Sequence, residues 1–552
     1  MNFDSTIQCC IMLLLFIIVM MVRPSMAEEP IKYFLRDMNT TIEGTIEVEN
    51  DKLRGVVDGL KHYRLLPGDF SYGKYHFDGL ATVMKFQFDV NQNGKIVASF
   101  FAKPYESQAY QDKDDHKCVF FGTGIGPYIH SVLPTGGVCF LNPGVNLLPI
   151  NGELWLTIDT ASWGRVDSET LETVPNAKAE VNSLVLNAHP ACDRLTGECF
   201  VQHPCPEKSS PDSKDVCFSI LEADENVADL KTTIVSRSTL EKSKIIQHSH
   251  SPCITQNYVV SKLDAFVFRD PLTNHNGGLL KYAHQGEDDE WLVMNRNTNE
   301  SVVMRSTGHA FVNNHFCTWI CLFLPYSSSI SLSLSLSTHT HTHIHTHTGN
   351  CVENENGDVI VETVTATKDY LDNYFDFNLA KMPNWSDLFH DPLRCVVPKF
   401  ENGSSSEIEC GTLLSSDSAL TYFDYPTFNP EWKMNPSYRF FYAIAPKDTS
   451  SSRWFDSVVK IDRSTNKEVA TYSDTGLYFT EADFIPLDGD EKDEDDGVLL
   501  TIAYNATSDD SLLIFLDAKD FTVLSSSSFG FVIPFHAHGI SCAKDRACWT
   551  NP

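Results

Sequence analysis

Short runs of alternating apolar and polar residues, each followed by a turn sequence, constrain the fold of this chain more than any other feature. Met84–Val90 alternates and runs into the turn Asn91–Gly94, and Leu154–Ile158, Val498–Tyr504 and Leu512–Leu516 are further strand-like runs. A period of two ending in Asn, Asp or Gly is typical of β-hairpins. Long amphipathic helical patterns are few, so the sequence predicts an all-β chain.

One turn pattern recurs along the chain. An apolar residue precedes Asp, a few polar residues and then Thr, in Val166–Thr170, Asp193–Gly197, Ile461–Thr465 and, more loosely, Leu516–Thr522. An Asp in the first turn position can accept a hydrogen bond from the backbone two residues on, so each copy is expected to close a hairpin. Many hairpins in 552 residues favour a propeller, sandwich or barrel, and radial repetition is the simplest of these.

The charge of the chain argues against one class of partner. Lys+Arg is 42 and Asp+Glu is 73, which gives a net charge of −31. Such an acidic surface repels phosphate backbones, so no nucleic-acid partner is expected. The hydrophobic share of 42% is enough to build a sizeable core.

The N-terminus has the features of a targeting segment. Cys9–Val22 is an apolar run of 14 residues, and Ser25-Met26-Ala27 offers small residues for cleavage before Glu28. The run is short for a membrane span, so residues 1–27 are predicted to be a signal peptide, with an uncleaved anchor as the alternative. The predicted location is the secretory pathway or the extracellular space; a peripheral membrane or cytoplasmic location is the alternative.

Sequons and cysteines agree with an oxidising compartment. The N-x-S/T sequons are at Asn39, Asn299, Asn384, Asn402 and Asn505. Fourteen cysteines remain beyond the predicted signal peptide, and close spacings such as Cys192–Cys199 and Cys542–Cys548 suit disulfides. The sequence leaves their pairing open.

One segment differs in composition from the rest. Residues 317–348 pass from Ser-Leu alternation into His-Thr alternation, which no ordered fold requires. A His-rich metal-binding tract is one interpretation. The interpretation we favour is a low-complexity insertion, either a translated intron or a disordered loop.

Four other histidines lie in strand-like settings flanked by turns, namely His189, His250, His315 and His538. A single histidine in such a setting is more typical of a structural role than of a metal ligand. Their wide spacing also rules out a local metal motif such as H-E-x-x-H.

The surroundings of these histidines resemble the motifs of the carotenoid cleavage oxygenase family. The resemblance begins near residue 60, reaches the C-terminus and rests on several motifs in order. These motifs are Tyr75–Leu80, Ala188-His189-Pro190 before Asp193–Glu198, His250-Ser251-x-x-x-Thr255-x-Asn257-Tyr258, Asp495–Val498, and Pro534-Phe535-x-x-His538-Gly539.

The third histidine motif of the family is interrupted here. The family pattern is His, two residues, Asn, two residues and an acidic residue. Removing residues 317–348 joins His315-Phe316 to Gly349-Asn350-Cys351-Val352-Glu353 and restores that pattern. This is the reason for interpreting the segment as an insertion.

The resemblance implies a single domain over residues 28–552, a seven-bladed β-propeller with a helical or loop cap over one face. It implies that His189, His250, His315 and His538 bind Fe(2+), with no catalytic residue beyond this metal site. A histidine ligand usually needs its second ring N–H held by a carboxylate. The family uses three glutamates, and the matching positions are Asp159, Asp424 and Glu481, of which two are one methylene shorter.

The implied activity is cleavage of a double bond in a carotenoid or apocarotenoid polyene by dioxygen, giving aldehyde or ketone products. Within the same fold, a retinoid isomerohydrolase-type enzyme is an alternative. A secreted propeller that binds carotenoid without turnover is another. Phe120–Ile129 lies near where the family has a membrane-contacting segment, so peripheral membrane contact is a further expectation.

Overall fold

The structure is a computed structural model that describes the chain from residue 36 to residue 550 with gaps. The described residues are 36–38, 40–69, 79–111, 142–150, 152–159, 162–180, 183, 186–206, 214–223, 229–240, 249–263, 266–268, 280–282, 289–306, 311–313, 343–367, 389–399, 407–452, 454–487, 493–544 and 548–550. Several predicted features lie outside them: the signal peptide, Phe120–Ile129, His315, and the sequons at Asn39, Asn384 and Asn402.

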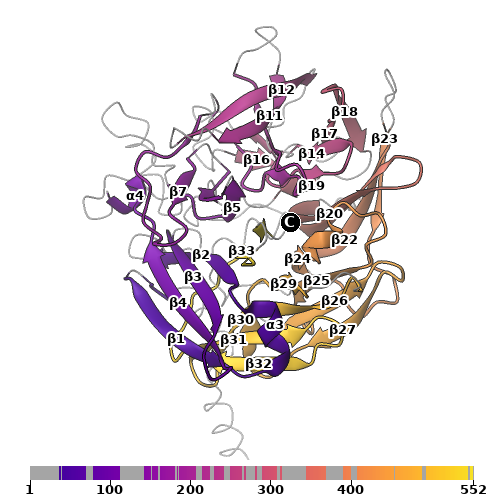
Figure 1. The fold of residues 1–552 in the computed structure, drawn as a ribbon. Coiled ribbons are helices and arrows are strands. Elements are labelled where there is room, and N and C mark those ends of the chain that lie inside the picture. The colour runs from indigo at the N-terminus through magenta and orange to yellow at the C-terminus, as the bar shows by residue number, and fades with distance from the viewer. Residues whose placement is uncertain are drawn as a thin grey trace, which may run out of the picture.

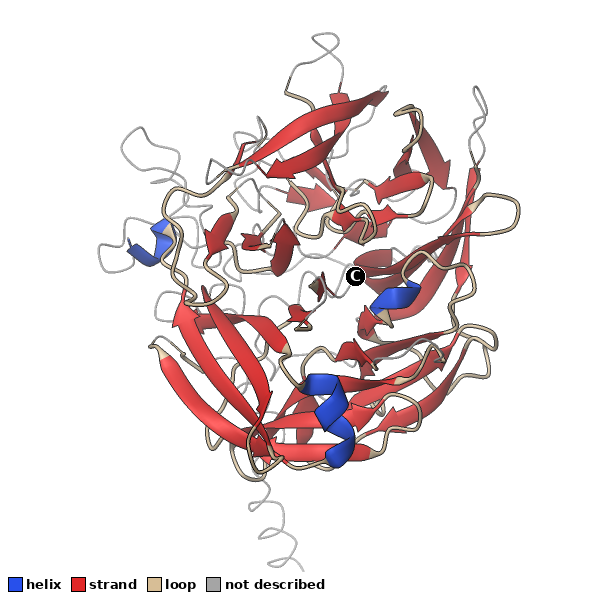
Figure 2. Cartoon of the chain, viewed as in Figure 1, coloured by secondary structure: helices blue, strands red, loops and turns tan. Residues whose placement is uncertain are grey.

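The described residues form mainly β-strands, and each helix among them has at most four residues (Figure 2). These helices are η1 (Asp51–Leu53), α3 (Arg54–Val57), α4 (Gln108–Gln111) and η5 (Pro430–Trp432). The predicted all-β class is therefore confirmed.

The described strands form seven hydrogen-bonded sheets, and Figure 1 shows the larger of them arranged around a central region. The first contains, in order, β1 (Ile42–Val48), β4 (Ile96–Pro104), β3 (Leu80–Val90), β2 (Lys61–Asp69), β33 (Gly539–Cys542) and β34 (Trp549–Thr550). A small sheet follows with β5 (Asn146–Ile150), β6 (Glu153–Thr157) and β7 (Gly164–Val166). The next has β8 (Ala179–Glu180), β12 (Leu230–Leu240), β11 (Lys214–Ala223), β10 (Cys199–Pro204) and β9 (Ala191–Cys192).

The longest sheet has nine strands and contains two hairpin series joined by the parallel pair β18–β23. One series is β13 (Cys253–Ile254), β14 (Tyr258–Lys262), β17 (Asp289–Asn295) and β18 (Ser301–Ser306). The other is β23 (Glu407–Thr412), β22 (Phe389–Val397), β21 (Val359–Thr367), β20 (His343–Glu353) and β19 (Phe311–Asn313). The strands β13 and β20 are thus far apart in the hydrogen-bonded order.

Three sheets complete the described fold. The first is β15 (Phe266–Phe268) with β16 (Leu280–Tyr282). The second contains β24 (Asp424–Thr427), β25 (Phe440–Ala445), β26 (Ser457–Asp462) and β27 (Lys467–Tyr472). The third contains β28 (Leu477–Phe479), β30 (Gly497–Asn505), β31 (Asp510–Asp517) and β32 (Val523–Ser528), with β29 (Asp483–Pro486) paired to β30. The antiparallel pair β2–β33 joins the beginning of the described chain to its end.

The recurring Asp turns close hairpins as the sequence predicts. The Asp462 carboxylate accepts a hydrogen bond from the backbone N–H of Ser464 at 2.8 Å, between β26 and β27. Asp517 accepts one from Lys519 at 2.8 Å, between β31 and β32. These side-chain bonds satisfy turn N–H groups that the strand ladders leave unpaired.

The largest apolar cluster of the described residues includes the segment before His538. Trp454 and Phe535 are 0% and 2% exposed, and their rings meet edge to face at 5.2 Å. Burying an apolar side chain of this size contributes roughly 1.5–3 kcal/mol. Since Phe535 is three residues before His538, this core fixes the segment that carries His538.

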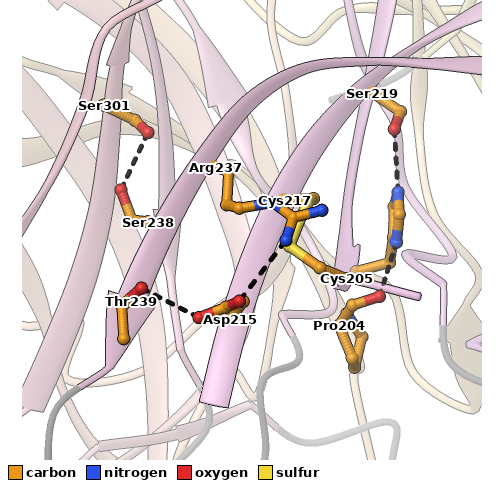
Figure 3. Close-up of a disulfide and its surroundings, with 10 residues drawn as sticks. Pro204, Cys205, Asp215, Cys217, Ser219, Arg237, Ser238, Thr239 and Ser301 are labelled. Atoms are coloured by element: carbon orange, nitrogen blue, oxygen red, sulfur yellow. Dashed lines mark hydrogen bonds and ion pairs between the residues drawn. A yellow bond between two sulfur atoms is a disulfide. The ribbon is translucent and has the colours of Figure 1, made fainter. Parts of the chain in front are cut away.

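All ten cysteines that the structure describes form disulfides. The pairs are Cys192–Cys199, Cys205–Cys217, Cys253–Cys351, Cys395–Cys410 and Cys542–Cys548. Cys205–Cys217 joins the end of β10 to β11, beside a buried Asp215 that accepts a hydrogen bond from Thr239 at 2.8 Å and pairs with Arg237 at 3.4 Å (Figure 3).

Candidate metal centre

Four buried histidines from distant parts of the chain meet at the centre of the molecule. His189 precedes β9, His250 precedes β13, His347 lies in β20, and His538 precedes β33. Their side chains are between 0% and 5% exposed. The ring centroid of His189 is 4.3 Å from that of His538 and 4.7 Å from that of His250.

Three of these histidines are close enough to share one ion. The candidate ligand atoms of His189, His347 and His538 all lie within 4.8 Å of one another. The Nε2 atoms of His347 and His538 are 3.2 Å apart. His250 completes the group from the side of His189, with its ring centroid 6.2 Å from that of His347.

The backbone holds these segments together. The N–H of His189 donates to the carbonyl of His250 at 3.2 Å. The hydroxyl of Thr348, next to His347, donates to the carbonyl of Ser251 at 3.0 Å. His189, His250 and His347 are thus each bonded through their own backbone or a neighbouring residue to another part of the cluster.

Polar residues of the histidine motifs also connect the strands. The Glu353 carboxylate accepts the backbone N–H of Asn257 at 2.8 Å and its side-chain amide at 2.7 Å. The side chain of Asn350 donates to the carbonyl of Trp432 at 3.1 Å and accepts from the N–H of Met434 at 2.9 Å. These contacts fix the β20 end that follows His347.

Each of three histidines has a carboxylate at its Nδ1. Asp159 lies 2.8 Å from Nδ1 of His250, Asp424 lies 2.6 Å from that of His347, and Glu481 lies 3.5 Å from that of His538. A carboxylate at Nδ1 holds the proton there and leaves Nε2 as the lone-pair donor. The two shorter aspartates reach their histidines directly, so the loss of a methylene relative to glutamate does not break this contact.

The pKa values of His538 and Glu481 are both shifted downward. Burial lowers the pKa of His538, which favours the neutral imidazole that a metal requires. Burial by itself would raise the pKa of Glu481, but His538 and Arg64 favour the carboxylate more strongly, and the net shift of its pKa is downward.

The fully buried Arg64 contacts the Glu481 carboxylate. The Nη1 atom of Arg64 is 3.5 Å from Glu481 Oε2, and its Nη2 donates to the Glu481 carbonyl at 2.9 Å and pairs with Asp483. Its Nε donates to Nε2 of His62 at 2.9 Å. Gly539 is needed here because an added Cβ would lie 2.9 Å from the Arg64 side chain.

The third histidine of the cluster differs from the sequence prediction. The prediction named His315, which lies outside the described residues, whereas His347 occupies the site from the end of the low-complexity segment. His347 is followed by two residues, Asn350, two residues and Glu353, so it satisfies the family pattern without any excision. That spacing in the intact chain is the signal that sequence reasoning missed.

The low-complexity segment is not uniform in the structure. Residues 317–342 lie outside the described part, while the stretch from His343 to Thr348 belongs to β20. The backbone of this stretch pairs with β21, with Thr348 opposite Thr363. Excision of residues 317–348 would therefore remove His347 along with the insertion.

The donor set fits a soft-to-intermediate metal ion. Four imidazoles with no anionic ligand suit iron, copper, nickel or zinc and do not suit Mg²⁺ or Ca²⁺, which prefer oxygen. A hollow opens beside His189 and is lined by the Cys253–Cys351 disulfide and Lys433. Burial lowers the pKa of Lys433 to about 8.

Replacing Asp159 with Ala is expected to weaken metal binding by about 10–100-fold, because His250 loses the group that orients its ring. Titration of the apoprotein with metal checks this. Asp215→Ala is the matched control, since it removes a buried carboxylate that contacts Arg237 and Thr239 and no histidine of the cluster. Equal affinities in the two variants would contradict a role for Asp159 at the metal.

One protein family matches most of this chain. The family model described as retinal pigment epithelial membrane protein matches residues 57–319 and 328–540. The chain belongs to this family, and the resemblance found in its motifs is confirmed. In the part of the chain that the structure describes, no helix has the length and apolar character needed to cross a bilayer.

Individual relatives agree with the family. The mitochondrial carotenoid-cleaving dioxygenase of Mustela putorius furo is 22% identical over 91% of this chain and 95% of its own length. The human protein of the same name is 22% identical over 86% of this chain and 84% of its own. These relatives support the prediction of an enzyme of the carotenoid oxygenase class.

Solved structures share the fold. A single-residue variant of Synechocystis apocarotenoid oxygenase superposes with a TM-score of 0.68 at 17% identity, covering 95% of this chain and 100% of its own. Pseudomonas brassicacearum lignostilbene dioxygenase gives a TM-score of 0.67 at 16% identity, covering 92% and 96%.

Proposed function

We propose that this protein is a non-haem Fe(II) dioxygenase that cleaves a double bond of a carotenoid or apocarotenoid polyene into two carbonyl products. The observation that carries the proposal is the buried cluster of His189, His250, His347 and His538, with a carboxylate at Nδ1 of three of them. The names of the relatives support the same reaction class.

The residues of this chain orient the metal ligands and exclude water, and they do not themselves react. Asp159, Asp424 and Glu481 hold the Nδ1 protons and fix the ring planes, so the Nε2 atoms remain available as ligands. The Tyr425 ring lies tilted against the His347 ring with their centroids 4.7 Å apart, and the Phe535 ring is 6.0 Å from that of Tyr425, so aromatic side chains exclude water from that side. Bound Fe(II) would supply the chemistry of dioxygen activation.

We further propose a seven-bladed propeller with a helical or loop cap. The circular succession of sheets in Figure 1 and the pairing of β2 with β33 support this architecture. In a propeller the innermost strands converge on one axis, which explains how ligands some 350 residues apart meet. The cap would carry any peripheral membrane contact.

The disulfides indicate the kind of cellular compartment in which the protein acts. Disulfides persist in oxidising compartments and are rare in the cytosol. Five of them in the described chain support the proposal that residues 1–27 are a signal peptide and that the protein acts in the secretory pathway or outside the cell.

Product analysis tests the function. The full chain is expressed through the secretory pathway, loaded with Fe(II) and supplied with β-carotene and oxygen, and products are separated by chromatography and identified by mass. Apocarotenoid aldehydes are expected, and their masses show which bond is cut. A His250→Ala control should give none.

Folded, iron-loaded protein that yields no aldehyde would contradict β-carotene cleavage. Turnover of a retinyl ester to a cis-retinol would then favour the retinoid isomerohydrolase-type alternative. Retention of unchanged carotenoid would favour the carotenoid-binding alternative.

A further inference from the structure

A cysteine follows each histidine of the cluster at nearly the same spacing. Cys192 and Cys253 lie three residues after His189 and His250, and Cys351 and Cys542 lie four residues after His347 and His538. All four are in disulfides. Along an extended strand this spacing corresponds to roughly 10–13 Å, so each proposed ligand is followed within that distance along the chain by a disulfide bond.

The three disulfides differ in the segments that they join. Cys192–Cys199 and Cys542–Cys548 close loops of 7 and 6 residues and brace one ligand segment each. Cys253–Cys351 spans 98 residues and joins the segment of His250 directly to that of His347. In the described chain it is the one disulfide in which both cysteines closely follow a histidine of the cluster in sequence.

The strands that Cys253–Cys351 joins share no backbone ladder. β13 and β20 contact each other, but β14, β17, β18, β23, β22 and β21 separate them in the hydrogen-bonded order. Across this gap Thr348 hydrogen-bonds to Ser251 and Asn257 to Glu353, and Cys253 and Cys351 share one apolar cluster with Val260 and Val361. Among these contacts the disulfide is the one covalent link between the segments of His250 and His347.

We propose that the Cys253–Cys351 disulfide is a positioning element of the metal centre that holds His250 and His347 at the separation one metal ion requires. The inference rests on the proposed metal site and deepens it, because metal affinity becomes dependent on the oxidation state of the protein. Reduction by a dithiol breaks the S–S bond, forms two thiols and converts the dithiol to its own disulfide.

The Cys253–Cys351 disulfide and His189 line one hollow. Cys253 and Cys351 are only 7% and 2% exposed, yet both line the hollow together with His189. Because His189 and this disulfide line the same hollow, bound metal is expected to slow the reduction of the disulfide.

The test compares two double variants of the full-length secreted protein. Cys253→Ala/Cys351→Ala removes the proposed positioning disulfide, and Cys395→Ala/Cys410→Ala is the matched control in the same sheet, joining β22 to β23 away from the histidines. Apoprotein of each is titrated with Fe(II) or Co(II), with circular dichroism to verify folding. Affinity about 10–100-fold weaker than wild type is expected for the first variant and unchanged affinity for the control.

Equal metal affinity in the two folded variants would overturn the proposal. If the first variant does not fold, wild-type protein is treated with dithiothreitol, and mass mapping of alkylated cysteines is followed beside the rate of metal loss to a chelator. Metal loss that tracks reduction of Cys253–Cys351 supports the proposal, and full metal retention after that reduction overturns it. Wild-type protein that binds no metal would instead contradict the proposed function itself.

Discussion

Replacing His347 with Ala is expected to remove the metal and abolish oxygenase activity. His347 contacts His538 through Nε2 at 3.2 Å and has Asp424 at its Nδ1 at 2.6 Å, so the change takes away one ligand and leaves the Asp424 carboxylate without its histidine. Loss of a supporting carboxylate costs 10–100-fold in affinity, and loss of a ligand is expected to cost at least about 100-fold. Metal content after purification and titration of the apoprotein measure this.

The matched control is His315→Ala in the same full-length chain. It is expected to retain metal, because the structure brings His347 into the cluster. If His315→Ala loses the metal and His347→Ala keeps it, the third ligand is His315 as the sequence prediction has it. The pair of variants thus separates the two candidates without altering the length of the chain.

Two deletions of 32 residues extend the comparison. Removing residues 315–346 joins Asn314 to His347, while removing residues 317–348 leaves His315 before Phe316 and Gly349. Both keep a histidine at the same distance from Asn350. Metal binding by both would mean that the low-complexity segment adds nothing to the centre, since either histidine can complete it.

The variant Arg64→Met is expected to lower the free energy of unfolding by about 3–5 kcal/mol. Arg64 is 0% exposed and pairs with Glu481 and Asp483, so its removal leaves two buried carboxylates without their cation. Denaturant unfolding with disulfides intact measures the change. The same variant should bind metal more weakly, because Glu481 loses the group that holds it against His538.

Arg36→Met is the control for Arg64→Met. Arg36 pairs with Asp509 on the surface, where the two side chains are 39% and 52% exposed, and an exposed pair contributes at most about 1 kcal/mol. A stability loss in Arg64→Met no larger than that of the control would show that the buried pairing is not needed.

The sequence predicted much of the site because its motifs are local. His189, His250 and His538 each lie within a short pattern of turn residues, and the structure brings all three together. Asp159 and Asp424 were predicted from position alone, and each contacts a histidine of the cluster directly. The metal role of these residues stays a prediction until it is measured.

The third histidine was harder to predict for a physical reason. Five histidines alternate with other residues between His339 and His347, so composition gives none of them a distinct signal. Only the spacing to Asn350 and Glu353 distinguishes His347, and His315 acquires the same spacing if residues 317–348 are removed. Which one enters the cluster depends on strand pairing of β20, which is a long-range property.

Disulfide pairing and the Arg64 contacts also depend on long-range structure. Cys253 and Cys351 are 98 residues apart, and nothing local to either marks the other as its partner. Arg64 meets Glu481 across 417 residues of sequence. Such contacts exist only after distant parts of the chain have come together.

The most direct test of the metal centre is an anomalous difference map, collected at the iron absorption edge from crystals of the Fe(II)-loaded full-length protein. We expect a single strong peak within bonding distance of the Nε2 atoms of His189, His250, His347 and His538. A peak held by other residues, or no peak at the four histidines in iron-loaded crystals, would contradict it.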